Sequence, residues 1–174
     1  MKNIYNIVGF QLSWWGCVLG VKFHLVYLGP ILMAIFLISH LYLFVSSRSE
    51  IKLIILFGFV GTLLDTSMFY GGILHYNGSY TANTFIAPLW ITSMWCGFSA
   101  TINHSLSWLK NRYFYSILLG AISGPLSYLA GVKFGAIEFS TLPIIAISVV
   151  ALFYGLTIPF MYWVNERLTF NQRI

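Results

Sequence analysis

Asp65 is the only acidic residue that lies deep within a long apolar segment of this sequence. A charge in hydrocarbon is costly, so carboxyl groups at such depth usually face the interior of a helix bundle and are paired or neutral. A carboxyl group there could take up and release a proton, act as a general acid or base, or bind the polar part of a ligand. The structural alternative is that Asp65 only joins helices through hydrogen bonds. Both interpretations are open at this point.

The neighbours of Asp65 can be estimated from depth, because an α-helix rises about 1.5 Å per residue. Five side chains fall within roughly one to one and a half turns of its depth: Gln11, Trp14, Trp95, Ser127 and Tyr128. We predict a buried polar site made of Asp65, Gln11, Trp14, Trp95 and Tyr128. Aromatic side chains around a solitary carboxyl group are more typical of a ligand pocket than of an ion path.

His40 and His104 form a secondary candidate site, with Asn103 beside His104. Both histidines fall near the same end of the expected helices, where they could line a polar mouth. Because no carboxylate neighbours them in those helices, we predict hydrogen-bonding groups and not a metal site. No metal ion and no cofactor are therefore expected.

Several classes of membrane enzyme require residues that this sequence lacks. It has no histidine boxes for a di-iron desaturase and no DxxxD or DDxxD array for magnesium and pyrophosphate. The segment 121–124 is similar to the serine motif of rhomboid proteases, but the first glycine of that motif is missing and every histidine precedes Ser123. We find no recognisable catalytic motif and favour a protein that is not an enzyme.

The elements that position these residues follow from composition: 59% of the 174 residues are hydrophobic and only 7% are charged, too few to coat a water-soluble globule. A membrane-spanning helix needs about 20 apolar residues. We predict an all-α, polytopic membrane protein, a bundle of six transmembrane helices in a single domain, 1–174. The expected spans are 4–21, 25–45, 53–74, 84–109, 114–132 and 142–164.

Basic residues set the expected orientation of the six spans. One side carries Lys2, Arg48, Lys52, Lys110, Arg112, Arg167 and Arg173, and the other carries Lys22 and Lys133. This positive-inside bias predicts that both termini lie in the cytoplasm. We expect the membrane to be the inner membrane of a bacterium. Because the basic residues are scattered singly between apolar segments, we expect no nucleic-acid partner.

Small residues of the fifth expected span fall on one face, within an arc of about 80 degrees. They are Gly120, Gly124, Ser127, Gly131 and Gly135. Such a face allows close helix packing, and we favour packing within the chain over a homodimer interface. Cys17 and Cys96 lie in apolar segments and support neither a disulfide framework nor a metal knuckle.

The sequence also resembles a bacterial inner-membrane family described only as a domain of unknown function, DUF2878. The matching residues are Phe10-Gln11 with Trp14 and Cys17-Val18, Asp65 in its glycine-containing segment, Pro88-Leu89-Trp90 with Trp95, Thr101, Ser105-Leu106 and Trp108-Leu109, and Gly124-Pro125-Leu126 with Tyr128, Gly131 and Gly135-Ala136. The resemblance implies a compact polytopic membrane protein and a link to lipid metabolism, but no established activity. His104 departs from the small or apolar residue expected there, which weakens a catalytic role for it.

We therefore expect a membrane protein that binds or handles a lipid or another apolar molecule, in the lipid bilayer and beside a lipid-modifying enzyme partner. The first alternative is a proton-coupled secondary transporter that uses Asp65. The second is a membrane enzyme with Asp65 as general acid or base. The third is a structural or assembly subunit that docks through the small-residue face.

Overall fold

The computed structural model describes residues 2–45, 47–79 and 86–170. Within these ranges the chain forms six α-helices, one short 3-10 helix and two short strands. In chain order they are α1 Lys2–Lys22, α2 Leu28–Phe44, α3 Arg48–Tyr70, β1 Leu74–Tyr76, α4 Leu89–Ser99, η1 Ser107–Leu109, α5 Tyr113–Lys133, β2 Ile137–Phe139 and α6 Pro143–Phe170. Apart from the two strands, the regular structure of the described residues is helical, in agreement with the predicted all-α class.

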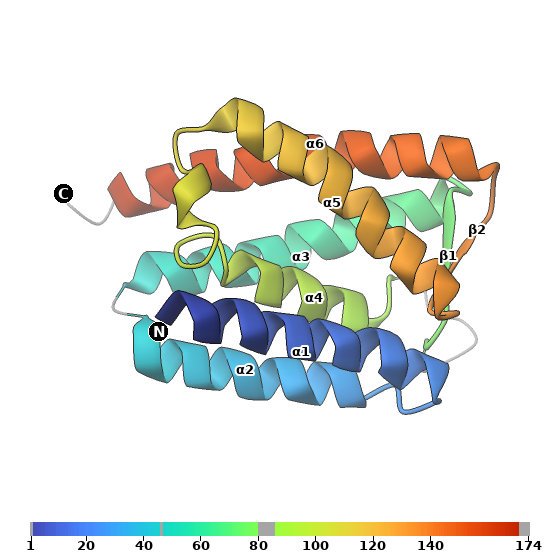
Figure 1. The fold of residues 1–174 in the computed structure, drawn as a ribbon, viewed down its shortest axis with the longest axis horizontal. Helices are drawn as coiled ribbons and strands as arrows, with labels where there is room; N and C mark the ends of the chain where they lie inside the picture. The colour runs from blue at the N-terminus through green and yellow to red at the C-terminus, as the bar shows by residue number, and fades with distance from the viewer. Residues whose placement is uncertain (1, 46, 80–85, 171–174) are drawn as a thin grey trace.

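The helices pack mainly as three pairs, α1 with α2, α3 with α4, and α5 with α6. Contacts between α2 and α4 and between α3 and α6 join the pairs into one bundle. Figure 1 shows α3 and α4 between the α1–α2 pair and the α5–α6 pair. The start of α1 and the end of α6 lie at one end of the bundle, which we call the N-terminal end; the strands lie at the other, the strand end.

The fourth predicted helix, 84–109, is wrong in its extent. Residues 84 and 85 lie outside the described residues, α4 ends at Ser99, and the chain then turns until η1. The turns are rich in polar side chains, and the Thr101 hydroxyl donates at 2.6 Å to the Phe98 carbonyl in the last turn of α4. Such side chains compete with the backbone hydrogen bonds of a helix, and here they end it.

The third predicted helix, 53–74, is also corrected at both ends, because α3 runs from Arg48 to Tyr70. After it, β1 pairs with β2 in an antiparallel two-stranded sheet with Leu74 opposite Phe139 and Tyr76 opposite Ile137. Gly72 precedes β1 with a φ of 65° and Gly135 precedes β2 with a φ of 76°. These left-handed conformations favour glycine, so each helix ends where glycine lets the chain turn into its strand.

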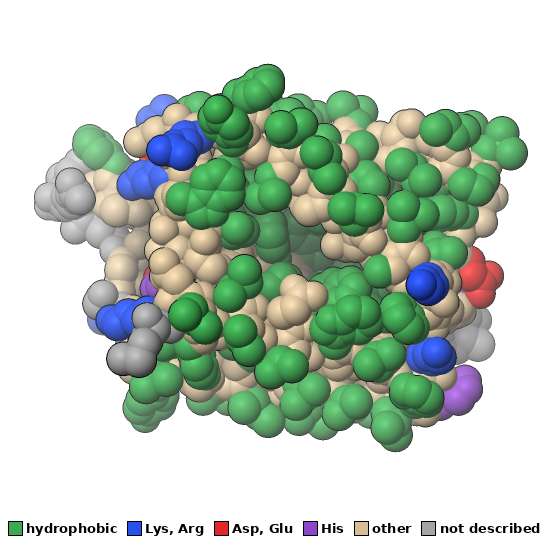
Figure 2. Space-filling view, in the orientation of Figure 1, with side chains coloured by type: hydrophobic (Ala, Val, Ile, Leu, Met, Phe, Trp, Pro, Cys, Tyr) green, Lys and Arg blue, Asp and Glu red, His purple; other side chains and the backbone are tan. Residues whose placement is uncertain are grey.

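Four helices, α1, α3, α5 and α6, are long and apolar enough to cross a membrane. The helix α2 is apolar but shorter, with 17 residues, and α4 has 11 residues. The surface of the bundle carries many exposed apolar side chains, which cover most of the face shown in Figure 2. These are the features of a membrane protein, while the number of six crossings stays a prediction.

Basic residues lie at the two ends of the bundle. Lys2 begins α1, Arg48 begins α3 and Arg167 lies in the last turn of α6, all at the N-terminal end. Lys22 and Lys133 lie in the last turns of α1 and α5, at the strand end. Arg173, which contributes to the predicted charge bias, lies outside the described residues. In Figure 2 the Lys and Arg side chains flank a middle zone that is mostly hydrophobic.

Candidate functional site

The Asp65 side chain is fully buried on α3, and three donors bond to its carboxyl group. The Trp95 indole N–H donates to Oδ2 at 2.6 Å, and the Tyr76 hydroxyl donates to Oδ1 at 2.6 Å. The Tyr128 hydroxyl also donates to Oδ1. These four residues, which we call the Asp65 cluster, come from α3, β1, α4 and α5 and tie these elements together.

Tyr76 is the member of the Asp65 cluster that sequence reasoning missed, because it belonged to a predicted polar loop. In β1 the side chains of Leu74 and Tyr76 are buried and that of His75 is exposed, the alternation typical of a strand. That alternation was the only local signal. Burial raises the pKa of the Tyr76 phenol well above its ordinary range, and the Asp65 carboxyl group raises this pKa further, so Tyr76 keeps the proton that it donates.

A cavity of about 410 Å³ lies beside the Asp65 cluster, lined by side chains of α1, α4, α5 and α6 together with Ile137 of β2. Eight of the 19 residues that line it are aromatic, among them Trp14, Trp95 and Tyr128. Figure 2 shows a hollow in the middle of this face, between α5 and α1 and rimmed by hydrophobic side chains. Because α1 packs mainly on α2, and α5 on α6, the two helices leave this space between them.

Asp65 lies behind the wall of this cavity and is not part of it. Trp95 and Tyr128 each donate to Asp65 and also line the cavity. Tyr154 of α6 extends the same wall: its ring stacks on that of Trp95, with centroids 5.1 Å apart, and its hydroxyl lies 3.3 Å from that of Tyr128. Asp65 thus orients two of the aromatic side chains that shape the cavity, Trp95 and Tyr128.

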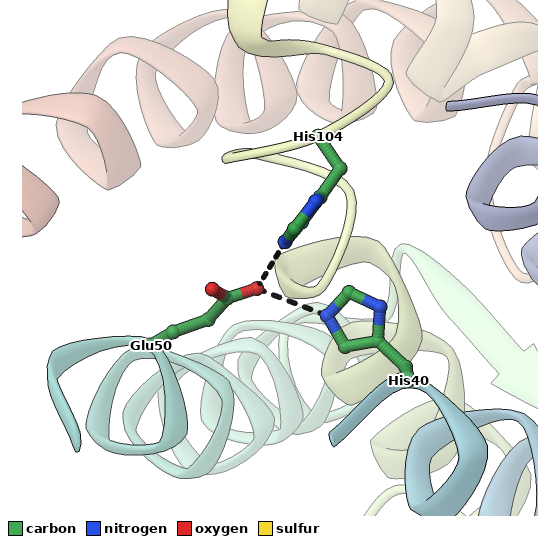
Figure 3. Close-up of side chains that lie close together, drawn as sticks. All are labelled: His40, Glu50 and His104. Carbon is green, nitrogen blue, oxygen red and sulfur yellow. Dashed lines mark hydrogen bonds and ion pairs between the residues drawn. The ribbon is translucent and has the colours of Figure 1, made fainter. Parts of the chain in front are cut away.

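A second buried cluster lies at the N-terminal end of the bundle, where Glu50 meets two histidines (Figure 3). Nε2 of His40 lies 2.9 Å and Nε2 of His104 lies 2.8 Å from the same atom, Oε1 of Glu50. The two imidazole rings meet edge to face, with centroids 4.7 Å apart. We call these three residues the Glu50 cluster.

A comparison with known protein families identifies the family of the chain. The model of the family described as "Protein of unknown function (DUF2878)" matches residues 3–160. The chain belongs to this family. The resemblance noted from its motifs is therefore confirmed. No curated protein and no solved structure matches the chain. The family's description assigns no activity.

The structure divides the predicted polar site into two layers. Trp95 and Tyr128 bond directly to Asp65, as their depth in the sequence indicated. Gln11 and Trp14 instead line the cavity from α1 and do not bond to Asp65. Among the described residues, the hydrogen-bond partners of Asp65 are thus the three other members of its cluster, Tyr76, Trp95 and Tyr128.

The secondary candidate site is also rearranged. His40 and His104 lie together, but Asn103 turns away and exchanges hydrogen bonds with Asn165 of α6, at 2.7 and 3.2 Å. The premise that no carboxylate lies near the histidines is wrong, because Glu50 contacts both. Glu50 was missed because it fell in a predicted loop, whereas the Ser47 side chain caps α3 and Glu50 lies buried in its first turn.

The small-residue face of α5 packs largely within the chain. A Cβ atom on Gly120 would collide with the Tyr154 carbonyl oxygen, and one on Gly124 would lie 2.7 Å from the Tyr154 Cβ, so α5 and α6 touch closely there. Gly131 approaches Ile137 of β2, and Ser127 lines the cavity. Gly135 follows α5, and a Cβ atom there would meet no atom within 4 Å, so its assignment to helix packing is corrected.

Proposed function

We propose that this protein binds the apolar part of a lipid or a similar molecule in the cavity between α1 and α5. The observation that carries the proposal is the aromatic wall of a cavity of about 410 Å³. Small-molecule sites commonly enclose about 300–1,000 Å³ and are lined mainly by apolar and aromatic side chains with few polar groups. Here the polar groups include the side chains of Gln11, Ser123 and Ser127.

The position of the cavity favours a ligand that arrives from the bilayer. Basic residues lie at the two ends of the bundle, so the membrane plane runs across its middle, where the hollow lies (Figure 2). Trp15 on α1 is a cavity-lining residue with 37% of its surface exposed, and Leu126 on α5 is another, at 60%. An acyl chain could therefore move sideways from the hydrocarbon phase to the aromatic wall.

This proposal includes the predicted setting: six crossings of a bacterial inner membrane with both termini in the cytoplasm. At about 1.5 Å per residue, the 11 residues of α4 span only about 16 Å, half of the hydrocarbon core of about 30 Å. The turn that continues α4 keeps Ala100, Thr101 and Ile102 buried. Irregular backbone at membrane depth is tolerated when protein surrounds it, so α4 and this turn can together complete a crossing.

The contacts of Asp65 support a positioning role over proton-coupled transport. A transport carboxyl group must exchange its proton with both sides of the membrane. Asp65 has no exposed surface, and Tyr76, Trp95 and Tyr128 already occupy both of its oxygens. Asp65 is therefore better suited to holding the cavity wall than to carrying a proton.

Photolabelling tests the proposed function. The protein is reconstituted in lipid nanodiscs with a phospholipid that carries a diazirine on its acyl chain, and labelled residues are located by mass spectrometry. Labels should concentrate on cavity residues such as Trp14 and Met94. Ser127→Trp should reduce this labelling because a bulky side chain then fills the cavity.

The matched control is Ile122→Trp, one to two turns earlier on α5 at a position that is 52% exposed and lies outside the cavity wall. It should leave cavity labelling unchanged. If Ser127→Trp does not fold, Ser123→Phe on the same wall replaces it. Labelling spread evenly over the apolar surface, or equal in the cavity variant and the control, would contradict lipid binding in the cavity.

A further inference from the structure

The Glu50 cluster is separate from the proposed lipid cavity, since none of its three residues lines that wall. His40 comes from α2, Glu50 from the first turn of α3, and His104 from the turns after α4. Figure 3 shows the two imidazole rings directed at one carboxylate oxygen from different sides. Two consecutive helices and a turn more than 50 residues further along the chain thus bring two nitrogen ligands and one oxygen ligand to a common point.

We propose that His40, Glu50 and His104 bind a divalent transition-metal ion such as Zn²⁺. Their potential ligand atoms all lie within 4.8 Å of one another. Zn²⁺ binds imidazole nitrogen and carboxylate oxygen at about 2.0–2.2 Å, and two histidines with one carboxylate form one of its common ligand sets. Small rotations of the three side chains place one ion between them, where they now share hydrogen bonds.

Burial and charge favour a cation at this place. His40 has no exposed surface and Glu50 is 7% exposed. Within the described residues, the ion-pair partners of Glu50 are the two histidines, and no lysine or arginine takes that role. A buried carboxylate is costly unless it is paired with positive charge, which imidazoles supply only when protonated. A bound divalent ion supplies that charge and uses both imidazoles in their neutral form.

The position of the site allows an ion to reach it from water. It lies at the N-terminal end of the bundle, near the start of α3, and the side chain of His104 is 15% exposed. Three protein ligands would leave a fourth position of a tetrahedral ion for water or another ligand. Binding of an ion here does not require that the cavity binds a lipid, because the two sites share no residue.

Asn6 lies behind His40 and contacts Nδ1, the ring nitrogen that does not face Glu50. Its Oδ1 accepts hydrogen bonds from the backbone N–H and the hydroxyl of Ser105, and its Nδ2 donates to the Ala100 carbonyl at 3.0 Å, which fixes the amide orientation. Nδ2 lies 3.4 Å from Nδ1 of His40, longer than an ordinary hydrogen bond. Because the Asn6 amide nitrogen is a donor, it faces Nδ1 as an acceptor, and the ring proton lies on Nε2 toward Glu50. An ion bound at Nε2 must displace that proton to Nδ1 and break the long contact with Asn6.

Metal content and calorimetry test this inference. The purified full chain is treated with a chelator, dialysed against buffered Zn²⁺ and measured by inductively coupled plasma mass spectrometry and by titration calorimetry. We expect one Zn²⁺ per chain. Glu50→Gln and His104→Gln should each abolish stoichiometric binding, since each removes a ligand. The matched control is His75→Gln, an exposed histidine at the strand end, which should bind Zn²⁺ like the parent protein.

Folding is checked for each variant by size-exclusion chromatography. If the cluster variants do not fold, X-ray absorption of the Zn²⁺-loaded parent protein decides, and it should show nitrogen and oxygen ligands with two imidazoles. A folded parent protein that retains no Zn²⁺, a loss of binding in His75→Gln equal to that in Glu50→Gln, or a sulfur ligand from Cys17 or Cys96 would overturn the inference.

Discussion

The Asp65 cluster and the Glu50 cluster each centre on a buried carboxyl group, yet their partners differ in kind. Asp65 receives two phenol hydroxyls and one indole N–H, distributed over both of its oxygens. Glu50 receives two imidazoles, both directed at one oxygen. The first set consists of hydrogen-bond donors, whereas the imidazoles can also act as metal ligands.

This difference separates a structural role from a binding role. The donors of Asp65 come from elements on several sides and satisfy the carboxyl group, so they hold α3, α4, α5 and β1 in one arrangement. The two histidines converge on a single point from α2 and from the turn after α4, which leaves the cluster able to exchange hydrogen bonds for an ion. A buried carboxyl group in a membrane bundle is therefore interpreted best through its partners.

The largest effect is expected for Asp65→Ala. It would leave three buried donors unsatisfied, at about 1–3 kcal/mol each, so stability should fall by several kcal/mol. Asp65→Asn keeps one acceptor oxygen and should cost less. Thermal unfolding in detergent measures both variants, and an Asp65→Ala protein as stable as the parent would remove the structural role assigned to Asp65.

Much of the helical architecture follows from the sequence alone. Apolar segments of about 20 residues bounded by charged residues predicted α1 and α5 closely, and also the start of α6 at Pro143. The short α4 could not be predicted in this way, because its apolar segment continues into turns that the bundle buries. Hydropathy measures burial from water and does not distinguish a helix from a turn enclosed by other helices.

The two clusters were predictable to different degrees for a physical reason. Counting residues along straight helices predicted that Trp95 and Tyr128 lie at the depth of Asp65, and both side chains bond to it. Tyr76 depends on pairing between β1 and β2, whose opposed residues Leu74 and Phe139 are far apart in the sequence. Glu50 depends on which way the first turn of α3 faces, and tertiary packing decides this.

The second largest effect is expected from Zn²⁺ on stability. An ion that binds only the folded state at 100 times its Kd adds about 2.7 kcal/mol. The parent protein should gain this stability, and Glu50→Gln should not. Thermal unfolding with and without Zn²⁺ measures the gain, and an equal gain in Glu50→Gln would assign the ion to another place.

The smallest effect, about 1 kcal/mol, is expected for Tyr76→Phe, which removes one of the two hydroxyls on Oδ1 and leaves Tyr128 in place. Tyr42→Phe is the matched control, because that side chain is 90% exposed and its change should be neutral. The same loss should persist with saturating Zn²⁺, since the two clusters share no residue. If the difference in stability between Tyr76→Phe and the parent protein instead vanished at saturating Zn²⁺, the two clusters would be coupled, and the separation of a structural cluster from a binding cluster would fail.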